Sequence, residues 1–303
     1  MDTILQIVRQ EDLEKRFNRK HIDGMIRDAL NVPDNRVKIE QGVILLDKWI
    51  QHDGHHDSKK HRISQLLHMD LTKLVTDLFV GIAYVMQPQL FTSVTAQLAS
   101  RMGFSEKRES IQTVAEVLSV LCMTDAYDIT KADKMASLMI QSRIYLPDET
   151  KVFIENSEYL PPMVCEPLEL KSNYDSGYLT HKDSLILGQG NHHNGNICLD
   201  VLNKMNRVRL KLDVDFLRTV EEEPTFEMDT AEKRDMWLKF KRDSTRMYAL
   251  LATLCDEFYL THKVDKRGRI YAQGYHISTQ GSSYKKAMIE LSNEEVIEGV
   301  PSI

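Results

Sequence analysis

The stretch from Val264 to Tyr275 reads Val-Asp-Lys-Arg-Gly-Arg-Ile-Tyr-Ala-Gln-Gly-Tyr. If Ile270 to Tyr275 is extended, its side chains alternate between two faces. One face then carries charged and polar side chains: Asp265, Arg267, Arg269, Tyr271 and Gln273. The other face carries small and apolar residues: Gly268, Ile270, Ala272 and Gly274. Such a strand can pack its small face on a core and offer an acid and two guanidinium groups to a ligand.

The chemistry of the charged face predicts an anionic ligand. Guanidinium groups bind phosphate through paired hydrogen bonds, and Gly268 lets a ligand approach the backbone closely. A polymer of phosphates is therefore the expected ligand. Because the pattern D-x-x-G-R is short, the alternative is a charged turn that enters a strand.

The sequence on either side of this stretch carries a family resemblance. Upstream, Arg242 to Arg246 begins a helical, apolar run that reaches Phe258, and downstream Gln280-Gly281 precedes Lys285 and Lys286. A basic helix, D-x-x-G-R-I-Y-A, a loop with Q-G and then lysine is an order that resembles the single-subunit RNA polymerases of phages and mitochondria. In that family the motif joins the thumb to the first palm strand.

The composition is that of an ordinary globular protein. A chain of 303 residues with 28% charged residues can bury a core in one large or two medium domains. The net charge of -6 argues against a sequence-independent nucleic-acid coat protein, which is usually basic. From Lys233 to Arg269, however, ten Lys or Arg residues stand against five Asp or Glu residues, so we expect a local basic surface.

Neither secretion nor a membrane role is indicated. The cysteines are scattered without a C-x-x-C pair and are expected to be reduced thiols: Cys122, Cys165, Cys198 and Cys255. The longest apolar segment, Leu74 to Met86, contains Asp77 and is too short to span a bilayer.

Apolar periodicity predicts a helical first half of the chain. Helices are expected over residues 4–13, 23–30, 42–50 and, with breaks at Pro88, Gly103 and Asp125 to Asp128, over 64–144. Thr92 to Gly103 is typical of an amphipathic helix with a glycine stop. The helical signal fades from Tyr145 to Gly190.

The proline-rich segment Leu160 to Pro167, followed by Gly177-Tyr178, is similar to the P-M-V segment and later G-Y of the polymerase family. The alternative is an ordered interdomain loop whose path the prolines fix. Glycines common in the family segment are missing here, so contacts assigned to those glycines do not carry over.

Two long helices are expected before the motif, over Ile197 to Val220 and over about Ala231 to Tyr259. An antiparallel pair of this kind is what a polymerase thumb needs. Arg242 and Arg246 lie one turn apart and share a face of the second helix. The alternative is that this charged face only contacts solvent.

A histidine-rich patch offers a different interpretation. His52, His55, His56, Asp57 and His61 could bind zinc if they shared a helix face, which would fit a metal hydrolase. Gly54 interrupts such a helix, so a polar loop that enters a helix is favoured.

The resemblance implies a chain without catalytic residues of its own. The family's metal-binding aspartates and its nucleotide-binding lysine follow the D-x-x-G-R strand, whereas here Glu294 to Gly299 and the terminus at Ile303 leave no room for them. We therefore expect the smaller subunit of a split polymerase, similar to the two-chain enzyme of N-four-like podophages. Mg²⁺ is expected in the complete enzyme, bound by the partner chain.

The resemblance also implies roles for individual residues. Arg269 and Arg267 would contact template or hybrid phosphates, Asp265 would orient an arginine, and Gly268 would permit close approach. Lys285 and Lys286 fall where the family places a lysine near the RNA–DNA hybrid. Nucleic acid on the thumb would be held by three further residues: Lys241, Arg242 and Arg246.

The expected fold is mainly α, with a helical N-terminal domain over 1–190, thumb helices over 191–262 and a first palm segment over 263–303. A larger subunit with the fingers and the remaining palm would complete the right-hand polymerase fold and bury the edge at Ile270 to Tyr275 together with Ala287 to Leu291. The expected partners also include template DNA and a recruiting accessory factor. The expected location is the cytoplasm of an infected bacterium. The rival function is a stand-alone helical DNA-binding or regulatory protein.

Overall fold

The computed structural model describes residues 3–104, 106–131, 137–156, 159–188 and 191–293. The acidic tail Glu294 to Gly299 lies outside the described residues. The fold is mainly α, as predicted, and the chain forms two compact units. Residues 19–155 form the helical unit, and residues 1–18 with 156–303 form the motif unit. The predicted division at residues 190 and 262 follows functional role rather than packing, and it stays a prediction.

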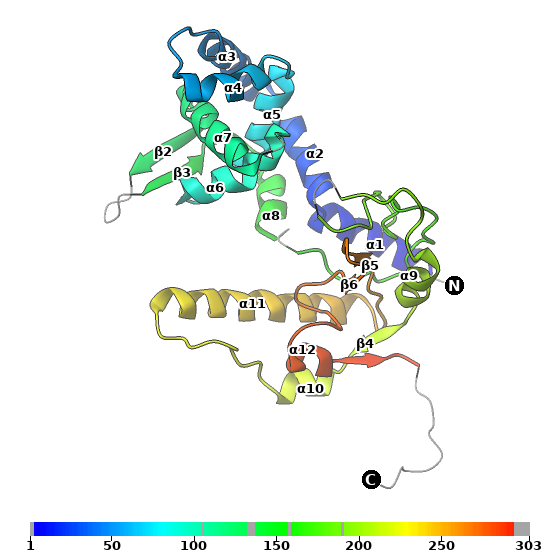
Figure 1. The fold of residues 1–303 in the computed structure, drawn as a ribbon. Coiled ribbons are helices and arrows are strands. Elements are labelled where there is room, and N and C mark those ends of the chain that lie inside the picture. The colour runs from blue at the N-terminus through cyan, green and yellow to red at the C-terminus, as the bar shows by residue number, and fades with distance from the viewer. Residues whose placement is uncertain (1–2, 105, 132–136, 157–158, 189–190, 294–303) are drawn as a thin grey trace, which may run out of the picture. The chain divides into compact units, whose positions relative to one another are not determined.

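Seven helices of the described residues build the helical unit (Figure 1). They are α2 (Arg19–Leu30), α3 (Pro33–Ile50), α4 (Asp57–Leu66), α5 (Leu71–Ala83), α6 (Phe91–Leu98), α7 (Lys107–Leu121) and α8 (Asp148–Asn156). Helix α5 is the most apolar of them, and Leu78 and Phe79 are fully buried in the core of this unit. Asp77 on the same helix is also buried, and it is compensated by Arg27 and Lys73. The segment Leu74 to Met86 is thus a core helix and the turn after it.

A three-stranded sheet completes the helical unit, with strand order β1-β3-β2. Its strands are β1 (Gln89–Leu90), β2 (Tyr127–Lys131) and β3 (Leu138–Ser142), all antiparallel. The prediction of helix up to Ile144 was wrong here, because Ile129 and Ile140 pair across the hairpin and Ile140 is buried in the core. The predicted helix with a glycine stop is confirmed: α6 tightens into a 3₁₀ turn that ends at Gly103.

The motif unit mixes helices with short strand pairs (Figure 1). Its elements are α1 (Ile4–Phe17), α9 (Leu199–Asn206), β4 (Leu210–Leu212), α10 (Val214–Thr219), α11 (Ala231–Leu254), β5 (His262–Val264), β6 (Ile270–Ala272), α12 (Ser283–Ala287) and β7 (Ile289–Leu291). Strand β4 pairs with β7, and β5 pairs with β6, both antiparallel. Phe258, Leu260, Met247 and Leu251 lie in the main core of this unit.

The predicted second helix is confirmed as α11, drawn in yellow in Figure 1, and it ends at Leu254. The predicted first helix over Ile197 to Val220 was wrong. The chain there forms α9, strand β4 and α10, so the antiparallel pair of long helices does not exist. Leu210 is buried and pairs with Leu291, and Asp213 begins α10 by accepting a hydrogen bond from the Phe216 N–H. Long-range strand pairing therefore overrides the local helical periodicity.

Two buried polar side chains of helix α1 hydrogen-bond to the proline-rich segment and to the residues that follow Tyr178. Gln10 accepts a hydrogen bond from the Val164 N–H (2.9 Å). Glu14 has a fully buried side chain and accepts hydrogen bonds from the N–H groups of Leu179 (2.9 Å) and Thr180 (2.8 Å). Burial would raise the pKa of Glu14, but hydrogen bonds from His181, Thr180 and Gln10 and from the Leu179 backbone outweigh it and lower this pKa to about 2.

Candidate nucleic-acid interface

The D-x-x-G-R residues form the tight loop of a β-hairpin. Strands β5 and β6 pair in the register Val264–Ile270, and the loop between them runs from Asp265 to Arg269. The Asp265 N–H donates to the Arg269 carbonyl (2.9 Å), and the Gly268 N–H donates to the Asp265 carbonyl (2.9 Å). Gly268 has φ of 82°, a left-handed conformation that glycine adopts without strain, and a Cβ built there would meet no atom within 4 Å. The loop is therefore fixed internally and open on the side of Gly268.

The Asp265 carboxylate organises the loop. One oxygen, Oδ1, accepts the backbone N–H groups of Arg267 (2.9 Å) and Arg269 (3.0 Å). The other oxygen, Oδ2, accepts from Nε of Arg269 (2.8 Å) and Nε of Arg267 (3.2 Å). The Tyr271 hydroxyl also approaches Oδ2 (3.4 Å). Asp265 therefore holds the guanidinium groups of both arginines by charge-assisted hydrogen bonds.

The two arginines stay accessible although both are held. The Asp265 side chain is 14% exposed, whereas those of Arg267 and Arg269 are 64% and 53% exposed. The contacts with Asp265 use Nε and Nη2 of each guanidinium, so the Nη1 donors remain for another acceptor. Two guanidinium groups against one carboxylate leave a net positive charge at the loop.

Electrostatics keep this arrangement charged over a wide pH range. Partial burial would raise the pKa of Asp265, but hydrogen bonds from the Arg269 backbone and side chain outweigh it, so the pKa lies below the usual range. The same contact raises the pKa of Arg269. The Arg269 guanidinium also lies 5.5 Å from the centre of the Tyr271 ring, within the range of a cation–π contact.

The predicted extended segment is shorter than expected. Strand β6 ends at Ala272. At Gly274 the chain passes so close to the Ile277 carbonyl that a Cβ would overlap it. Ile270 packs with Val264 on the inner side, as the alternation predicts. On the second edge of β6 the side-chain amide of Gln280 bonds the Ile270 carbonyl and the Ala272 N–H, so the expectation of an open edge was wrong for these two groups.

The expected partner contact at Ala287 to Leu291 stays a prediction. Residues Ile289 to Leu291 form β7, whose one edge is already paired with β4 of the same chain. Lys211 and Glu290 face each other across this pair at 3.4 Å. Leu291 remains 62% exposed.

Three predicted basic residues lie on α11. Arg242 and Arg246 are exposed and one turn apart on the face opposite the buried Met247 and Leu251. Arg242 pairs with its neighbour Asp243. Lys241 lies on the flank of the helix and is paired with Glu221 (2.8 Å), which raises the pKa of this lysine.

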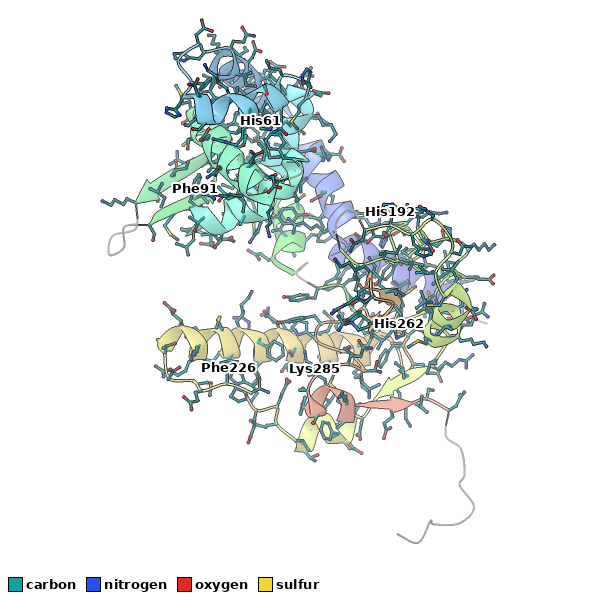
Figure 2. The ribbon with its side chains drawn as sticks, viewed as in Figure 1. His61, Phe91, His192, Phe226, His262 and Lys285 are labelled. Carbon is teal, nitrogen blue, oxygen red and sulfur yellow. The ribbon has the colours of Figure 1, made fainter. Side chains whose placement is uncertain are left out.

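The two lysines of α12 have different surroundings. Lys285, labelled in Figure 2, donates to the Tyr275 carbonyl (2.6 Å) and lies over the rings of Phe240 (5.1 Å) and Tyr275 (5.0 Å). Partial burial lowers its pKa, and the nearby Glu222 opposes that shift. Lys286 is exposed. Lys285 thus joins α12 to α11, whereas Lys286 is accessible.

The nine predicted site residues fall into three groups. The first is the hairpin loop with Asp265, Arg267, Gly268 and Arg269; the second is α11, and the third is α12. Two further residues belong to the first group, Tyr271 and Gln280, both of which contact the loop or its strand. Alternation places Tyr271 on the charged face, whereas no local pattern identifies the partner of Gln280.

The histidine patch does not gather into a metal site. His56 caps α4 by accepting from the Ser58 N–H, and His55 packs against Trp49. Among the residues with described positions, no three His, Cys, Asp or Glu side chains are placed to hold a metal ion. The residues from His52 to His56 form turns and irregular backbone that lead into α4. Over all the described residues, no helix has the length and apolar character needed to cross a membrane.

Comparison with known proteins gives a partial relationship. No protein-family profile matches the chain. A curated protein described as "Probable DNA-directed RNA polymerase", from Gelasinospora sp. (strain G114), is 31% identical over 144 residues. The alignment covers 43% of this chain and 17% of the relative, so the chain spans only a small part of that protein. Over the aligned residues the chain is related to a DNA-directed RNA polymerase, which confirms the general relationship that the motif order predicts.

Proposed function

We propose that this chain is the small subunit of a two-chain, phage-type DNA-directed RNA polymerase. It would supply the N-terminal domain, a thumb whose long helix is α11 alone, and the first palm segment to the transcription of phage genes in the cytoplasm of an infected bacterium. The observation that carries the proposal is the Asp265 loop: an acid that fixes two exposed arginines within a chain related to an RNA polymerase.

The loop is suited to bind the phosphates of template DNA or of the RNA–DNA hybrid. Phosphate oxygens accept charge-assisted hydrogen bonds from guanidinium donors, and Gly268 leaves the loop surface without a side chain. Because Asp265 already holds Nε and Nη2 of both arginines, binding a phosphate costs little further side-chain ordering. The roles given to Lys241, Arg242, Arg246, Lys285 and Lys286 belong to the same proposal.

The catalytic step would belong to a larger partner subunit with the fingers and the remaining palm. In polymerases of the palm type two metal ions hold the attacking and leaving oxygens, and Mg²⁺ would be bound by aspartates of that partner. This chain would bind and orient nucleic acid next to that centre. Its acidic whole-chain charge fits weak binding alone, with a recruiting factor in the cell.

RNA synthesis by the reconstituted pair tests the proposal. The chain is expressed alone and together with the product of the neighbouring reading frame, and nucleotide incorporation on single-stranded DNA is measured. We expect activity only in the joint preparation, and we expect Arg269→Ala to reduce it about tenfold or more. Arg218→Ala is the matched control, because Arg218 is an exposed arginine of the same unit with a single ion pair to Asp215.

Three other outcomes would contradict the proposal. Activity of the chain alone would mean that it contains a catalytic centre. Equal activity of wild type and Arg269→Ala at limiting template would remove the role of the loop. Failure to form a stoichiometric complex would favour the rival, a stand-alone DNA-binding regulatory protein.

A further inference from the structure

Gln280 closes the outer edge of β6 with its side chain. Its Nε2 donates to the Ile270 carbonyl (3.0 Å), and its Oε1 accepts from the Ala272 N–H (3.1 Å). Both groups lie on the edge of β6 that a neighbouring strand would bond in a sheet. The opposite edge of β6 is paired with β5, so the three-residue strand is hydrogen-bonded on both edges.

The two bonds of Gln280 flank Tyr271. The Tyr271 hydroxyl reaches the Asp265 carboxylate (3.4 Å), and its ring lies beneath the Arg269 guanidinium. Arg269 itself directly precedes the residue whose carbonyl Gln280 holds. Gln280 therefore holds the backbone of Ile270 and Ala272, on either side of Tyr271. Its hydrogen bonds do not involve the exposed guanidinium donors of the loop.

Gln280 also connects the hairpin to the lysine helix. Gly281 follows it with φ of 144°, and Ser282 then begins α12 by accepting a hydrogen bond from the Lys285 N–H (3.3 Å). The same short segment thus joins the strand beside Arg269 to the helix that carries Lys286. The exposed amide of Gln280 therefore lies in the chain between two of the three basic groups and is hydrogen-bonded to the strand that follows the first.

We propose that Gln280 is a positioning residue for nucleic-acid phosphate binding by Arg269. This inference rests on the proposed function of the loop. Gln280 would touch no phosphate itself; it would raise the affinity by keeping β6, and with it the Arg269 guanidinium, in the orientation that Asp265 selects. Loss of the amide would let the three-residue strand move away from Asp265 on its unsupported edge.

Binding of a fluorescein-labelled RNA–DNA hybrid by the full chain tests this role. Gln280→Leu keeps the size of the side chain and removes both hydrogen bonds, and we expect about five- to tenfold weaker binding. Gln280→Glu serves as a second variant, since it retains an acceptor for Ala272 and sets a carboxylate oxygen against the Ile270 carbonyl. It should weaken binding similarly. Thr279→Ala, an exposed neighbour, should leave binding unchanged.

A double-mutant cycle separates positioning from a general structural effect. If Gln280 acts through Arg269, Gln280→Leu should change binding less than about twofold when Arg269 is already alanine. In the Arg218→Ala background it should keep its full effect. If Gln280→Leu weakened hybrid binding by the same factor in the Arg269→Ala chain as in the wild type, the inference would be overturned while the proposed function stands. No loss of binding from Arg269→Ala alone would remove the proposed function, and this inference with it.

Discussion

Arg269 and the carboxylate of Asp265 are joined by three contacts within one five-residue loop. The Arg269 guanidinium contacts Oδ2 of Asp265 at 2.8 Å through both Nε and Nη2, and the Arg269 N–H donates to Oδ1 (3.0 Å). One carboxylate therefore fixes both the side chain and the backbone of the arginine. Because Arg267 uses the same two oxygens, the charge of Asp265 is shared between two guanidinium groups.

Asp265→Asn should separate the effect of the loop's positive charge from the effect of arginine orientation. The amide oxygen can still accept the backbone N–H groups, but the charge-assisted bonds to Arg267 and Arg269 are lost and the loop becomes one charge more positive. We expect non-specific DNA binding at low salt to stay equal or rise, while RNA synthesis by the reconstituted enzyme falls about tenfold. If Asp265→Asn lowered both DNA binding and RNA synthesis, the loop would have unfolded, and the variant would not report on the orientation of the arginines.

The salt dependence of DNA binding should report the number of phosphates at the loop. A cation that neutralises one phosphate contributes about one unit to the slope of log K against log salt. Arg269→Ala and Arg267→Ala should each lower that slope by about one, whereas Arg218→Ala should leave it unchanged. Fluorescence titrations at several salt concentrations measure the slope. An unaltered slope in both loop variants would show that these arginines do not contact phosphate.

Gly268→Ala should cost stability through the backbone alone. At φ of 82° an alanine is strained by about 1 kcal/mol, and no neighbouring atom adds a clash. We expect a small fall in thermal midpoint together with weaker nucleic-acid binding, since the methyl group covers the open side of the loop. Gly24→Ala is the control, because Gly24 lies in α2 with nothing within 4 Å and alanine should stabilise a helix there.

The sequence predicts those features that depend on neighbouring residues. A charged turn at Asp265 is one of the two expectations that the short D-x-x-G-R pattern allows, and α11 follows from apolar spacing. The stop at Gly103 of the 3₁₀ turn after α6 and the entry to α4 at His56 are equally local. Each of these needs no information from distant parts of the chain.

The features that the sequence does not predict depend on distant partners. Leu210 belongs to a strand because Leu291 lies opposite it, and these residues are far apart in the chain. Gln280 is an ordinary exposed amide until β6 is placed beside it. Glu14 belongs to a helix of unremarkable composition, and only the fold brings Leu179 and Thr180 to its carboxylate. Periodicity contains no information about such pairings, so these contacts require the structure.

The buried Glu14 should make the motif unit sensitive to acid. Its pKa of about 2 in the folded chain lies below the ordinary value of 4.5, so its contribution to the free energy of unfolding is fully present above about pH 5. That contribution is lost progressively as the pH falls through 4.5 toward 2. Glu14→Gln places an amide N–H₂ where the Thr180 N–H and hydroxyl now donate, and we expect it to destabilise the unit by about 2 kcal/mol at neutral pH.

Amide hydrogen exchange of the peptide that contains Leu179 and Thr180 measures this effect in the motif unit alone. The difference in protection between wild type and Glu14→Gln should be largest near neutral pH and should shrink on acidification, because the wild-type carboxylate becomes protonated while the amide does not titrate. Gln6→Glu near the start of α1 is the control and should show no such convergence, since the hydrogen bonds of Gln6 to Thr3 lie at the helix start, away from Leu179 and Thr180. A constant difference across the acid range would mean that Glu14 holds the loop by shape, and that its ionisation contributes nothing to the stability of the unit.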